Sequence, residues 1–302
     1  MQAQADEHHP ELHAALHHLL AAGGKRIRPT LVLLTGKMLG ADPARLPTLA
    51  AAIEMLHTAT LVHDDLIDGA LLRRGNPTLN ARWSPASTVL TGDFIFARAA
   101  KLAAEVDCLP IMRLFAETLA IIVNGELTQL FASEDSASHA NYERRIFAKT
   151  ASLFEMSTRA AAMISPVNES AVETMRNYGY QVGMAFQIVD DILDFNGQQI
   201  EVGKPVGSDL LQGLITLPTL YYIEAHPNDL DVQALLMEKA NTSREVLSRL
   251  VQSIPKSEAI GGALKEAAEY VRRAENLLVD MPAGIERQAL EDLARYIVDR
   301  RI

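Results

Sequence analysis

Apolar side chains recur every three or four residues through most of this 302-residue chain, which is the spacing of one face of an α-helix. Sustained alternation of Val and Ile, which would indicate strands, is absent from the sequence. Eight segments have the helical spacing: 30–40, 50–68, 88–104, 110–131, 143–164, 171–195, 263–279 and 288–300. Residues 228–257 and 265–302 are more charged and resemble amphipathic helices that cover a bundle. The pattern predicts an all-α fold with helices long enough to span it.

Helix-breaking residues separate these segments. They are Gly23-Gly24, Gly75-Asn76-Pro77, Ser165-Pro166, Gly203-Lys204-Pro205 and Pro282-Ala283-Gly284. The sequence has no Gly/Ser-rich or Pro-rich linker, and its hydrophobic content of 48% is enough for one large core. We therefore predict a single domain over residues 1–302.

One carboxylate pattern occurs twice, each time inside an apolar, helix-forming stretch: Asp64-Asp65-Leu66-Ile67-Asp68 and Asp190-Asp191-Ile192-Leu193-Asp194. Acids four residues apart lie one turn apart on the same helix face, with about 5–6 Å between their Cβ atoms. A half-buried pair of this kind is costly unless a cation compensates it. The alternative is a solvated run of charge, but both motifs sit in apolar surroundings. We predict that they face each other across a central cavity and bind Mg²⁺, because oxygen-only ligands suit it better than zinc.

Two basic segments are candidates for binding an anion. Gly23-Gly24-Lys25-Arg26-Ile27-Arg28-Pro29 leads into an apolar run, with Pro29 suited to the first turn of a helix. Three cations at a helix N-terminus favour a bound phosphate, although a solvated basic loop is the alternative. Arg73 and Arg74 follow the first Asp motif; they can complement a helix C-terminus or bind a phosphate beside a carboxylate-held metal.

Composition narrows the class of protein. A net charge of -10 argues against a general nucleic-acid binder, whose affinity rests on Lys and Arg clusters. Cys108 is the only cysteine, so an internal disulfide and a zinc knuckle are excluded. The first residues are acids and histidines rather than a signal peptide, and no uncharged run approaches the ~18 residues of a membrane span. We expect a soluble, cytoplasmic protein.

Five segments together resemble, in order and spacing over nearly the whole chain, the motifs of trans-type polyprenyl diphosphate synthases. The segments are GGKRIRP at 23–29, HTATLVHDDLIDGALLRRGNPT at 57–78, KTA at 149–151, FQIVDDILD at 186–194 and GKPVGSDLLQGLITLP at 203–218. The resemblance implies an isoprenoid-synthase helical bundle around a central active-site cavity. It also implies a cytoplasmic transferase of isoprenoid biosynthesis that acts as a homodimer.

The resemblance further implies a reaction. Three Mg²⁺ ions held by Asp64, Asp68 and Asp190 would bind the diphosphate of an allylic primer and promote its departure, leaving an allylic carbocation. Asp65, Asp191 and Asp194 would act in support or through water. Isopentenyl diphosphate would then attack through its terminal alkene carbon, and the departing diphosphate would remove the proton, so that condensation is head-to-tail and trans.

Other site residues carry over position by position. The resemblance assigns isopentenyl diphosphate binding to Lys25, Arg28, His57 and Arg74. It assigns contact with the allylic diphosphate to Arg73, Lys149, Thr150, Gln187 and Lys204, of which the last four are also the expected catalytic residues. Taken singly, most of these side chains would be interpreted as ordinary surface or helix residues. Their assignment to the site rests on the joint match of the five segments.

Product length is expected to depend on the helix turn before the first Asp motif. Ala59 and Thr60 are both small there, whereas aromatic residues near these positions in the resembled family end elongation early. This predicts a product of C20 or longer, in the geranylgeranyl-to-long-chain branch. Alternatively, the side chain that ends elongation lies deeper in the bundle than Ala59 and Thr60, at Met55, Leu56 or a residue of 119–131.

Two other functions compete with this prediction. A terpene cyclase usually keeps only one DDxxD motif and needs no isopentenyl site, whereas this chain has both motifs. A non-catalytic partner subunit of a heteromeric synthase is the second alternative. Its one supporting feature is Leu214, which stands where many relatives have Lys.

Overall fold

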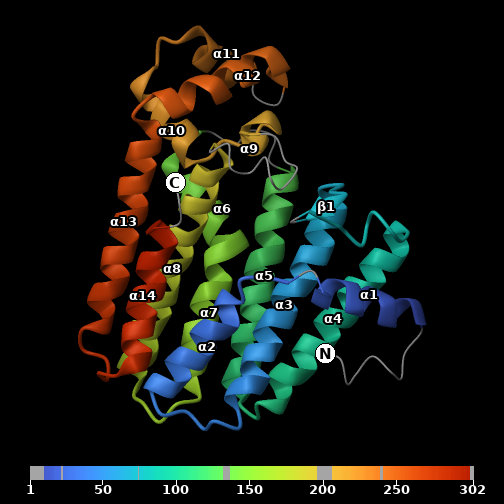
Figure 1. Ribbon diagram of the computed structural model, residues 1–302, viewed down its shortest axis with the longest axis vertical. Helices are drawn as coiled ribbons and strands as arrows, with labels where there is room; N and C mark the ends of the chain where they lie inside the picture. The colour runs from blue at the N-terminus through green and yellow to red at the C-terminus, as the bar shows by residue number, and fades with distance from the viewer. Residues whose placement is uncertain are drawn as a thin grey trace.

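The computed structural model describes residues 10–21, 23–73, 75–131, 137–195, 206–238 and 241–299. Most of these residues form helices, several of which run along the length of the molecule (Figure 1). The helices are α1 (Pro10–Ala21), α2 (Ile27–Met38), α3 (Leu46–Ile67), α4 (Pro85–Glu105), α5 (Leu109–Phe131), α6 (His139–Ile146), α7 (Ser152–Met163), α8 (Glu169–Asp194), α9 (Ser208–Leu211), α10 (Leu217–Ala225), α11 (Leu230–Glu238), α12 (Arg244–Ser253), α13 (Ala259–Leu278) and α14 (Ile285–Asp299).

The prediction of an all-α fold is confirmed, and each of the eight periodic segments coincides with helical structure except for one or two residues at some C-terminal ends. Two local features were not predicted. A two-stranded antiparallel hairpin, β1 (Leu72–Arg73) and β2 (Asn76–Pro77), follows the first Asp motif. The segment predicted as one helix over 143–164 contains a π-helical turn, Phe147–Ala151, between α6 and α7. Neither a two-residue strand nor a single extra residue in a helical turn leaves a periodic signal.

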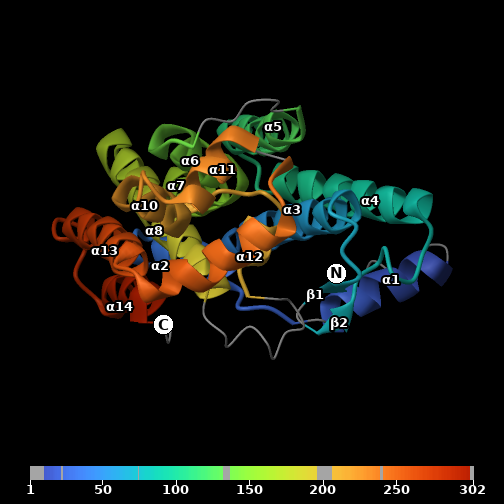
Figure 2. The same cartoon turned by 90° about the horizontal axis from the view of Figure 1, so that it is seen from above.

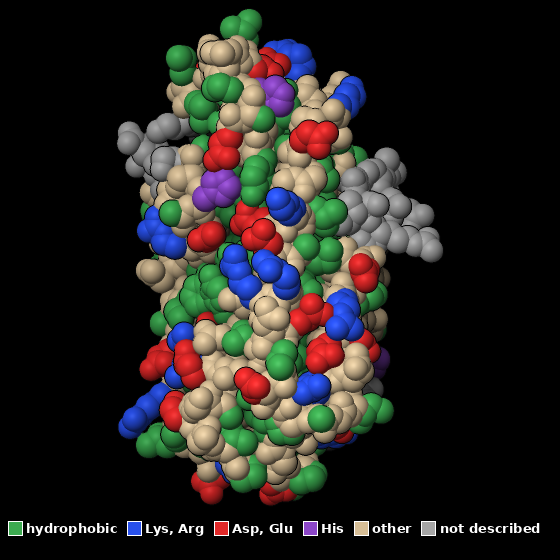
Figure 3. Space-filling model, turned by 90° about the vertical axis from the view of Figure 1, so that its left-hand side faces the viewer, with side chains coloured by type: hydrophobic (Ala, Val, Ile, Leu, Met, Phe, Trp, Pro, Cys, Tyr) green, Lys and Arg blue, Asp and Glu red, His purple; other side chains and the backbone are tan. Residues whose placement is uncertain are grey.

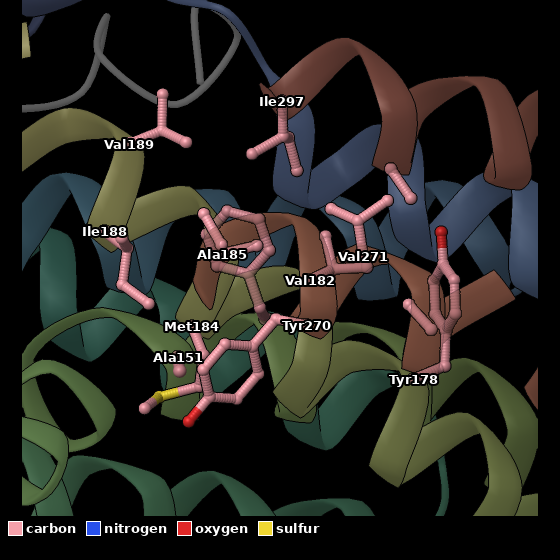
Figure 4. Close-up of a cluster of buried hydrophobic side chains, with 14 of the residues drawn as sticks. Ala151, Tyr178, Val182, Met184, Ala185, Ile188, Val189, Tyr270, Val271 and Ile297 are labelled. Atoms are coloured by element: carbon pink, nitrogen blue, oxygen red, sulfur yellow. The ribbon is translucent and has the colours of Figure 1, made fainter. Parts of the chain in front are cut away.

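Two large apolar clusters form the core. One joins α3 to α4, α5 and α7, and includes Leu49, Ile53 and Leu56 of α3, all fully buried. The other surrounds α8, whose Val182, Ala185 and Ile188 pack among side chains of neighbouring helices (Figure 4). Because α8 is buried around most of its circumference, its acidic end is fixed within the bundle.

The two helices that carry the Asp motifs run in the same direction. Both α3 and α8 end toward the part of the molecule that carries β1 and α9 (Figure 1). Seen from above, α12 lies across this same end (Figure 2). The fold therefore brings the C-terminal ends of both motif helices to one end of the bundle.

The C-terminal helices are amphipathic, as expected from their sequence. Ala263, Ala267, Ala274 and Leu278 form a buried stripe along α13. The outer face of the molecule on this side has acidic and basic side chains interspersed (Figure 3), as Arg273 and Glu269, 3.6 Å apart on α13, illustrate. This mixture of charges is typical of a solvated face.

Within the described residues, one helix passes a test of length and composition for a membrane span. It is α5, whose most apolar window is only 22% buried inside the protein. Its exposed side chains include Val123, Leu127 and Leu130, spaced as one helical stripe. These side chains form an exposed apolar surface along α5.

Candidate active site

Both Asp motifs lie in the last turns of their helices. Asp64 and Asp65 belong to the final turn of α3, which Asp68 caps, and α8 ends at Asp194. Neither helix has a basic residue in its last turn. A helix C-terminus already carries partial negative charge, so carboxylates placed there are destabilising without a compensating cation. The position of both motifs thus reinforces the requirement for positive charge at this end of the bundle.

The six aspartates divide into two groups by burial. Asp65, Asp191 and Asp194 are 6%, 4% and 4% exposed, respectively. Each accepts hydrogen bonds from protein donors; the acceptor Asp65 lies 2.8 Å from Nε of Arg73. By contrast, Asp64 and Asp190 are partly exposed and Asp68 is exposed. The first group is therefore placed to stabilise the site, and the second to meet a ligand.

Asp194 connects α8 to the start of α9. Its carboxylate accepts hydrogen bonds from Oγ of Ser208 at 2.7 Å and from the backbone N–H of Asp209 at 3.1 Å. The carbonyl of Asp194 also accepts from the backbone N–H of Gly207, at 2.8 Å. Three hydrogen bonds thus span this junction, so Asp194 fixes the chain where it returns to the bundle.

Asp64 lies in an environment that opposes its ionisation. Its pKa is raised from 3.8 to about 6. Burial is the largest cause, the positive charge of Lys149 lowers the pKa, and the carboxylates of Glu126 and Asp68 contribute to raising it. Lys149 Nζ lies 3.0 Å from Oε1 of Glu126. Burial lowers the pKa of Lys149, but Glu126 and Asp64 outweigh this and raise it overall. Lys149 is thus held as a cation beside Asp64.

The π-helical turn carries both Lys149 and Thr150 and is held closely from two sides. A Cβ at Gly125 of α5 would lie 2.5 Å from Cβ of Ala148, and one at Gly183 of α8 would lie 2.6 Å from Cα of Ala151. Both distances are far below van der Waals contact, so each glycine is needed for α5 and α8 to approach the turn. π-turns occur frequently at functional sites.

Thr150 begins a series of side-chain hydrogen bonds. Its Oγ1 donates to Oε1 of Gln187 at 2.6 Å, and Nε2 of Gln187 donates to Oδ1 of Asp191 at 2.7 Å. The hydroxyl of Tyr142 donates to Oδ2 of Asp191, also at 2.7 Å. Burial raises the pKa of Asp191 to about 7, assisted by Asp209, whereas the two hydrogen bonds lower it. The structure therefore brings together three predicted residues: Thr150, Gln187 and Asp191.

The basic segment before α2 adopts a strained backbone. Arg26 has φ 50° and ψ 34°, in the left-handed region, and its guanidinium pairs with Glu54 of α3. Glu54 precedes His57 by three residues, so this ion pair attaches the segment to the part of α3 that carries His57. Arg28 stacks on Phe154 of α7, with its Cζ 4.8 Å from the ring centroid. Lys25 is exposed.

Four other positions were predicted, two for diphosphate binding and two for product length. Arg74 and Lys204 lie outside the described residues. Ala59 is 2% exposed and packs within the core cluster around α3, while Thr60 is partly exposed. The hydroxyl of Thr60 donates to the carbonyl of His57 at 2.8 Å, which satisfies it within its own helix.

Sequence reasoning did not identify Glu126 or Tyr142 as site residues. Glu126 is one of two acids in the apolar segment 110–131 and directly follows Gly125, a combination that could have marked it. Tyr142 gives no such signal, because a tyrosine in an amphipathic helix is ordinary. Its contact with Asp191, which is 49 residues away, appears only in the folded chain.

The donor set fits a hard divalent cation bound together with a substrate. Among the residues that the structure describes, no group of three or more His, Cys, Asp or Glu side chains is arranged to hold a metal ion. Mg²⁺ usually takes one or two carboxylates and completes its shell with water and substrate phosphates. The raised pKa of Asp64, caused partly by neighbouring acids, is the conflict that such a cation relieves.

A family model described as polyprenyl synthetase matches residues 9–254. The chain belongs to the polyprenyl synthetase family. It is 37% identical over 294 residues to heptaprenyl diphosphate synthase component 2 of Bacillus subtilis (strain 168), covering 97% of this chain and 84% of that protein. It is also 37% identical over 287 residues to octaprenyl diphosphate synthase of Haemophilus influenzae, covering 94% of this chain and 86% of that protein.

A solved structure extends the similarity to the fold. The polyprenyl synthase of Caulobacter crescentus, crystallised with calcium and isoprenyl diphosphate, has a TM-score of 0.87 and 38% sequence identity, covering 96% of this chain and 89% of that one. Fold class and enzyme class are thereby confirmed: the chain is an isoprenoid-synthase bundle and a polyprenyl diphosphate synthase. The alternatives of a partner subunit and a cyclase are not favoured.

Proposed function

We propose that this polyprenyl synthase binds Mg²⁺ at Asp64, Asp68 and Asp190, as three ions together with an allylic diphosphate. The observation that carries the proposal is the division of the six aspartates. At the ends of α3 and α8, Asp64 and Asp190 are partly exposed and Asp68 is exposed, while the other three are buried. When bound, Mg²⁺ supplies positive charge that makes diphosphate a better leaving group.

The chain's own residues act on the leaving diphosphate and on the carbon that it leaves. Lys149, beside Asp64, is placed to bind the diphosphate oxygens, and Arg73 and Lys204 are proposed to do the same. Thr150 and Gln187 present oxygen atoms that stabilise the positive charge on the allylic carbon as the C–O bond breaks. Electrostatic stabilisation by groups fixed before reaction is the largest contribution that such a site can make.

Isopentenyl diphosphate is proposed to bind at Lys25, Arg28, His57 and Arg74. Two contacts support this: the stacking of Arg28 on Phe154, and the Arg26–Glu54 pair that attaches the basic segment near His57. The terminal alkene carbon attacks the allylic carbon, a C–C bond forms head-to-tail, and the released diphosphate takes the proton lost from isopentenyl diphosphate. The new double bond is trans.

We further propose that the product is C20 or longer. Ala59 is buried among the side chains of α3 and its neighbours and has no bulk to end the growing chain. The relatives described above include proteins named as heptaprenyl and octaprenyl synthases. The range of lengths in those names fits a pocket whose depth is set by individual side chains.

A homodimer is proposed through the exposed apolar stripe of α5 and the adjacent surface of α4. Val123, Leu127 and Leu130 of α5 are 47%, 45% and 56% exposed, and Leu90 of α4 is 67% exposed. An apolar surface of this extent favours a protein partner, and a second copy offers the same stripe to itself. The name of the Bacillus relative describes one component of a synthase, so a heteromer is the competing outcome.

The direct test is elongation by the purified chain alone. It would be incubated with Mg²⁺, labelled isopentenyl diphosphate and, separately, dimethylallyl, geranyl, farnesyl or geranylgeranyl diphosphate. Products are dephosphorylated and separated by length. We expect trans-prenols of C20 or longer. Folded protein that elongates none of the primers contradicts the proposal, and activity restored by a second protein would indicate a heteromeric synthase.

A further inference from the structure

The hydrogen bonds that begin at Thr150 join three separate elements. Thr150 lies in the π-helical turn, Gln187 and Asp191 lie one turn apart on α8, and Tyr142 lies on α6. Three of these residues are almost completely enclosed: Tyr142 is 1% exposed, Asp191 4% and Thr150 7%. Water has little access to these three residues, whereas Gln187 is partly exposed, so the enclosed residues set the geometry of the series.

The direction of these hydrogen bonds is fixed by Asp191. Its Oδ2 accepts from the Tyr142 hydroxyl, and its Oδ1 accepts from the Gln187 side-chain amide, in which only the NH₂ group is a donor. Gln187 therefore presents its NH₂ group to Asp191 and its oxygen to Thr150. If the amide were reversed, two acceptor oxygens would face each other at a distance of 2.7 Å. The hydrogen bond to Oδ1 of Asp191 thus determines the orientation of the Gln187 amide.

Tyr142 fixes the other side of that acceptor. Its hydroxyl lies 2.7 Å from Oδ2 of Asp191, the oxygen that Gln187 does not use. Its ring lies under the guanidinium of Arg145, whose Cζ is 5.6 Å from the ring centroid. Arg145 in turn donates to the carbonyl of Ile215, in the loop before α10. The tyrosine ring is therefore held in place independently of Asp191.

We propose that Tyr142 is a positioning residue for ionisation of the allylic substrate. By occupying Oδ2 of Asp191, it keeps the other carboxylate oxygen directed at Gln187, and so keeps the Gln187 oxygen beside Thr150. The inference rests on the proposed function, in which the Gln187 and Thr150 oxygens stabilise positive charge at the allylic carbon. Tyr142 itself touches neither substrate.

The test is Tyr142→Phe, which keeps the ring and removes only the hydroxyl. We expect kcat to fall about 10-fold, because small displacements of aligned groups are costly to the chemical step. KM for both diphosphates should change less than about twofold, since the binding cations are untouched. Kinetics would be measured with farnesyl and isopentenyl diphosphates, and folding would be checked by circular dichroism.

Tyr178→Phe is a matched control. Tyr178 is also a fully buried tyrosine, and its hydroxyl donates to the carbonyl of Leu290 at 2.8 Å, among the helices of the second core cluster (Figure 4). Both variants lose one buried hydrogen bond, so both should unfold at a lower temperature. Only Tyr142→Phe is expected to lower kcat. An equal loss of kcat in the two variants would show a purely structural role and overturn the inference.

A double variant tests whether Tyr142 acts through Gln187. In a Gln187→Leu background the proposed path is already broken, so adding Tyr142→Phe should change kcat less than about twofold. A further 10-fold loss in that background would overturn the inference. Wild-type activity of Tyr142→Phe would overturn it while leaving the proposed function intact, whereas an inactive wild-type chain would overturn both.

Discussion

Asp64 is the proposed metal ligand whose surroundings oppose its ionisation. Burial and the neighbouring carboxylates of Glu126 and Asp68 favour its protonated form, and only Lys149 and Arg73 oppose them. The resulting pKa of about 6 means that a proton and a metal ion compete for this carboxylate just below neutral pH. Because of this competition, binding of a metal ion to the metal-free protein should release a proton, which can be measured.

We predict that the apparent affinity for Mg²⁺ falls as pH is lowered through 6. Below this value the folded protein keeps a proton on Asp64, which must leave before the ion binds; above it the carboxylate is already ionised. Calorimetry with Mg²⁺ and inorganic diphosphate, in two buffers of different ionisation enthalpy, counts the protons released. More release is expected at pH 5.5 than at pH 8. The Asp64→Asn variant should release fewer protons at pH 5.5 than the wild type, and equal release by the two proteins would refute the assignment.

At position 59 we predict that a larger side chain shortens the product. Ala59→Phe adds an aromatic ring about one turn below Asp64, in the proposed path of the growing chain. Ala59→Ser, which stays small, is the control. Products would be compared by length at equal turnover, with thermal unfolding to detect overpacking of about 1–3 kcal/mol. An unchanged length distribution in a folded Ala59→Phe variant would exclude this position from the pocket.

Individual site residues were predicted from sequence where chemistry forces an unusual pattern. Paired acids in an apolar helix, such as Asp64 and Asp68, are conspicuous because they are costly. The division between exposed and buried acids depends on partners such as Ser208 and Tyr142, which come from other elements. The local sequence pattern around an acid carries no information on contacts with distant elements, so it could not predict which acids are buried.

Among the elements, the π-helical turn is the most constrained part of the site. It carries Lys149 and Thr150, and Gly125 and Gly183 allow the flanking helices to approach it. Helical periodicity located the surrounding helices to within a few residues. It could not locate the turn, because widening one helical turn shifts the periodic pattern by a single position.

We predict that Gly183→Ala impairs both stability and catalysis. The added Cβ would lie 2.6 Å from Cα of Ala151 and 2.9 Å from Cβ of Phe154, so the backbone must move. We expect a loss of about 1–3 kcal/mol in the free energy of unfolding and a lower kcat, because Lys149 and Thr150 move with the turn. Urea unfolding and steady-state kinetics measure the two effects.

Gly261→Ala is the control for that prediction. A Cβ at Gly261 of α13 would meet only Oε2 of Glu258, at 3.8 Å, which is an ordinary contact. This variant should be neutral or more stable by up to about 1 kcal/mol, because Ala favours a helix over Gly. If both variants behaved alike, close approach of α8 to the turn would not be the reason for Gly183.

On the scale of the whole molecule, the distribution of exposed side chains distinguishes two sides. The α13 side carries interspersed charge (Figure 3), whereas α4 and α5 expose an apolar stripe. Sequence periodicity predicted α5 as a helix but gave no indication of which of its apolar residues remain exposed. That distinction depends on which neighbours cover the helix, and it emerges only when the bundle is assembled.

We predict that Val123→Glu weakens or abolishes a homodimer. Val123 is 47% exposed at one end of the α5 stripe, where a buried unpaired charge would be costly in an interface. Met237→Glu changes an 81% exposed side chain of α11 and should leave assembly unchanged. Analytical ultracentrifugation would give the masses. A monomeric wild-type protein, or a Val123→Glu variant that dimerises normally, would contradict the assignment.

The central claim is that the ends of α3 and α8 form one metal-dependent site for ionising an allylic diphosphate. The most direct measurement is the rate of elongation by Asp64→Asn and Asp190→Asn, with Mg²⁺ and saturating primer. One acid comes from each helix, and we expect both variants to remain folded and to lose at least about 100-fold in kcat. Wild-type turnover by either folded variant would show that the two helix ends do not act as one site.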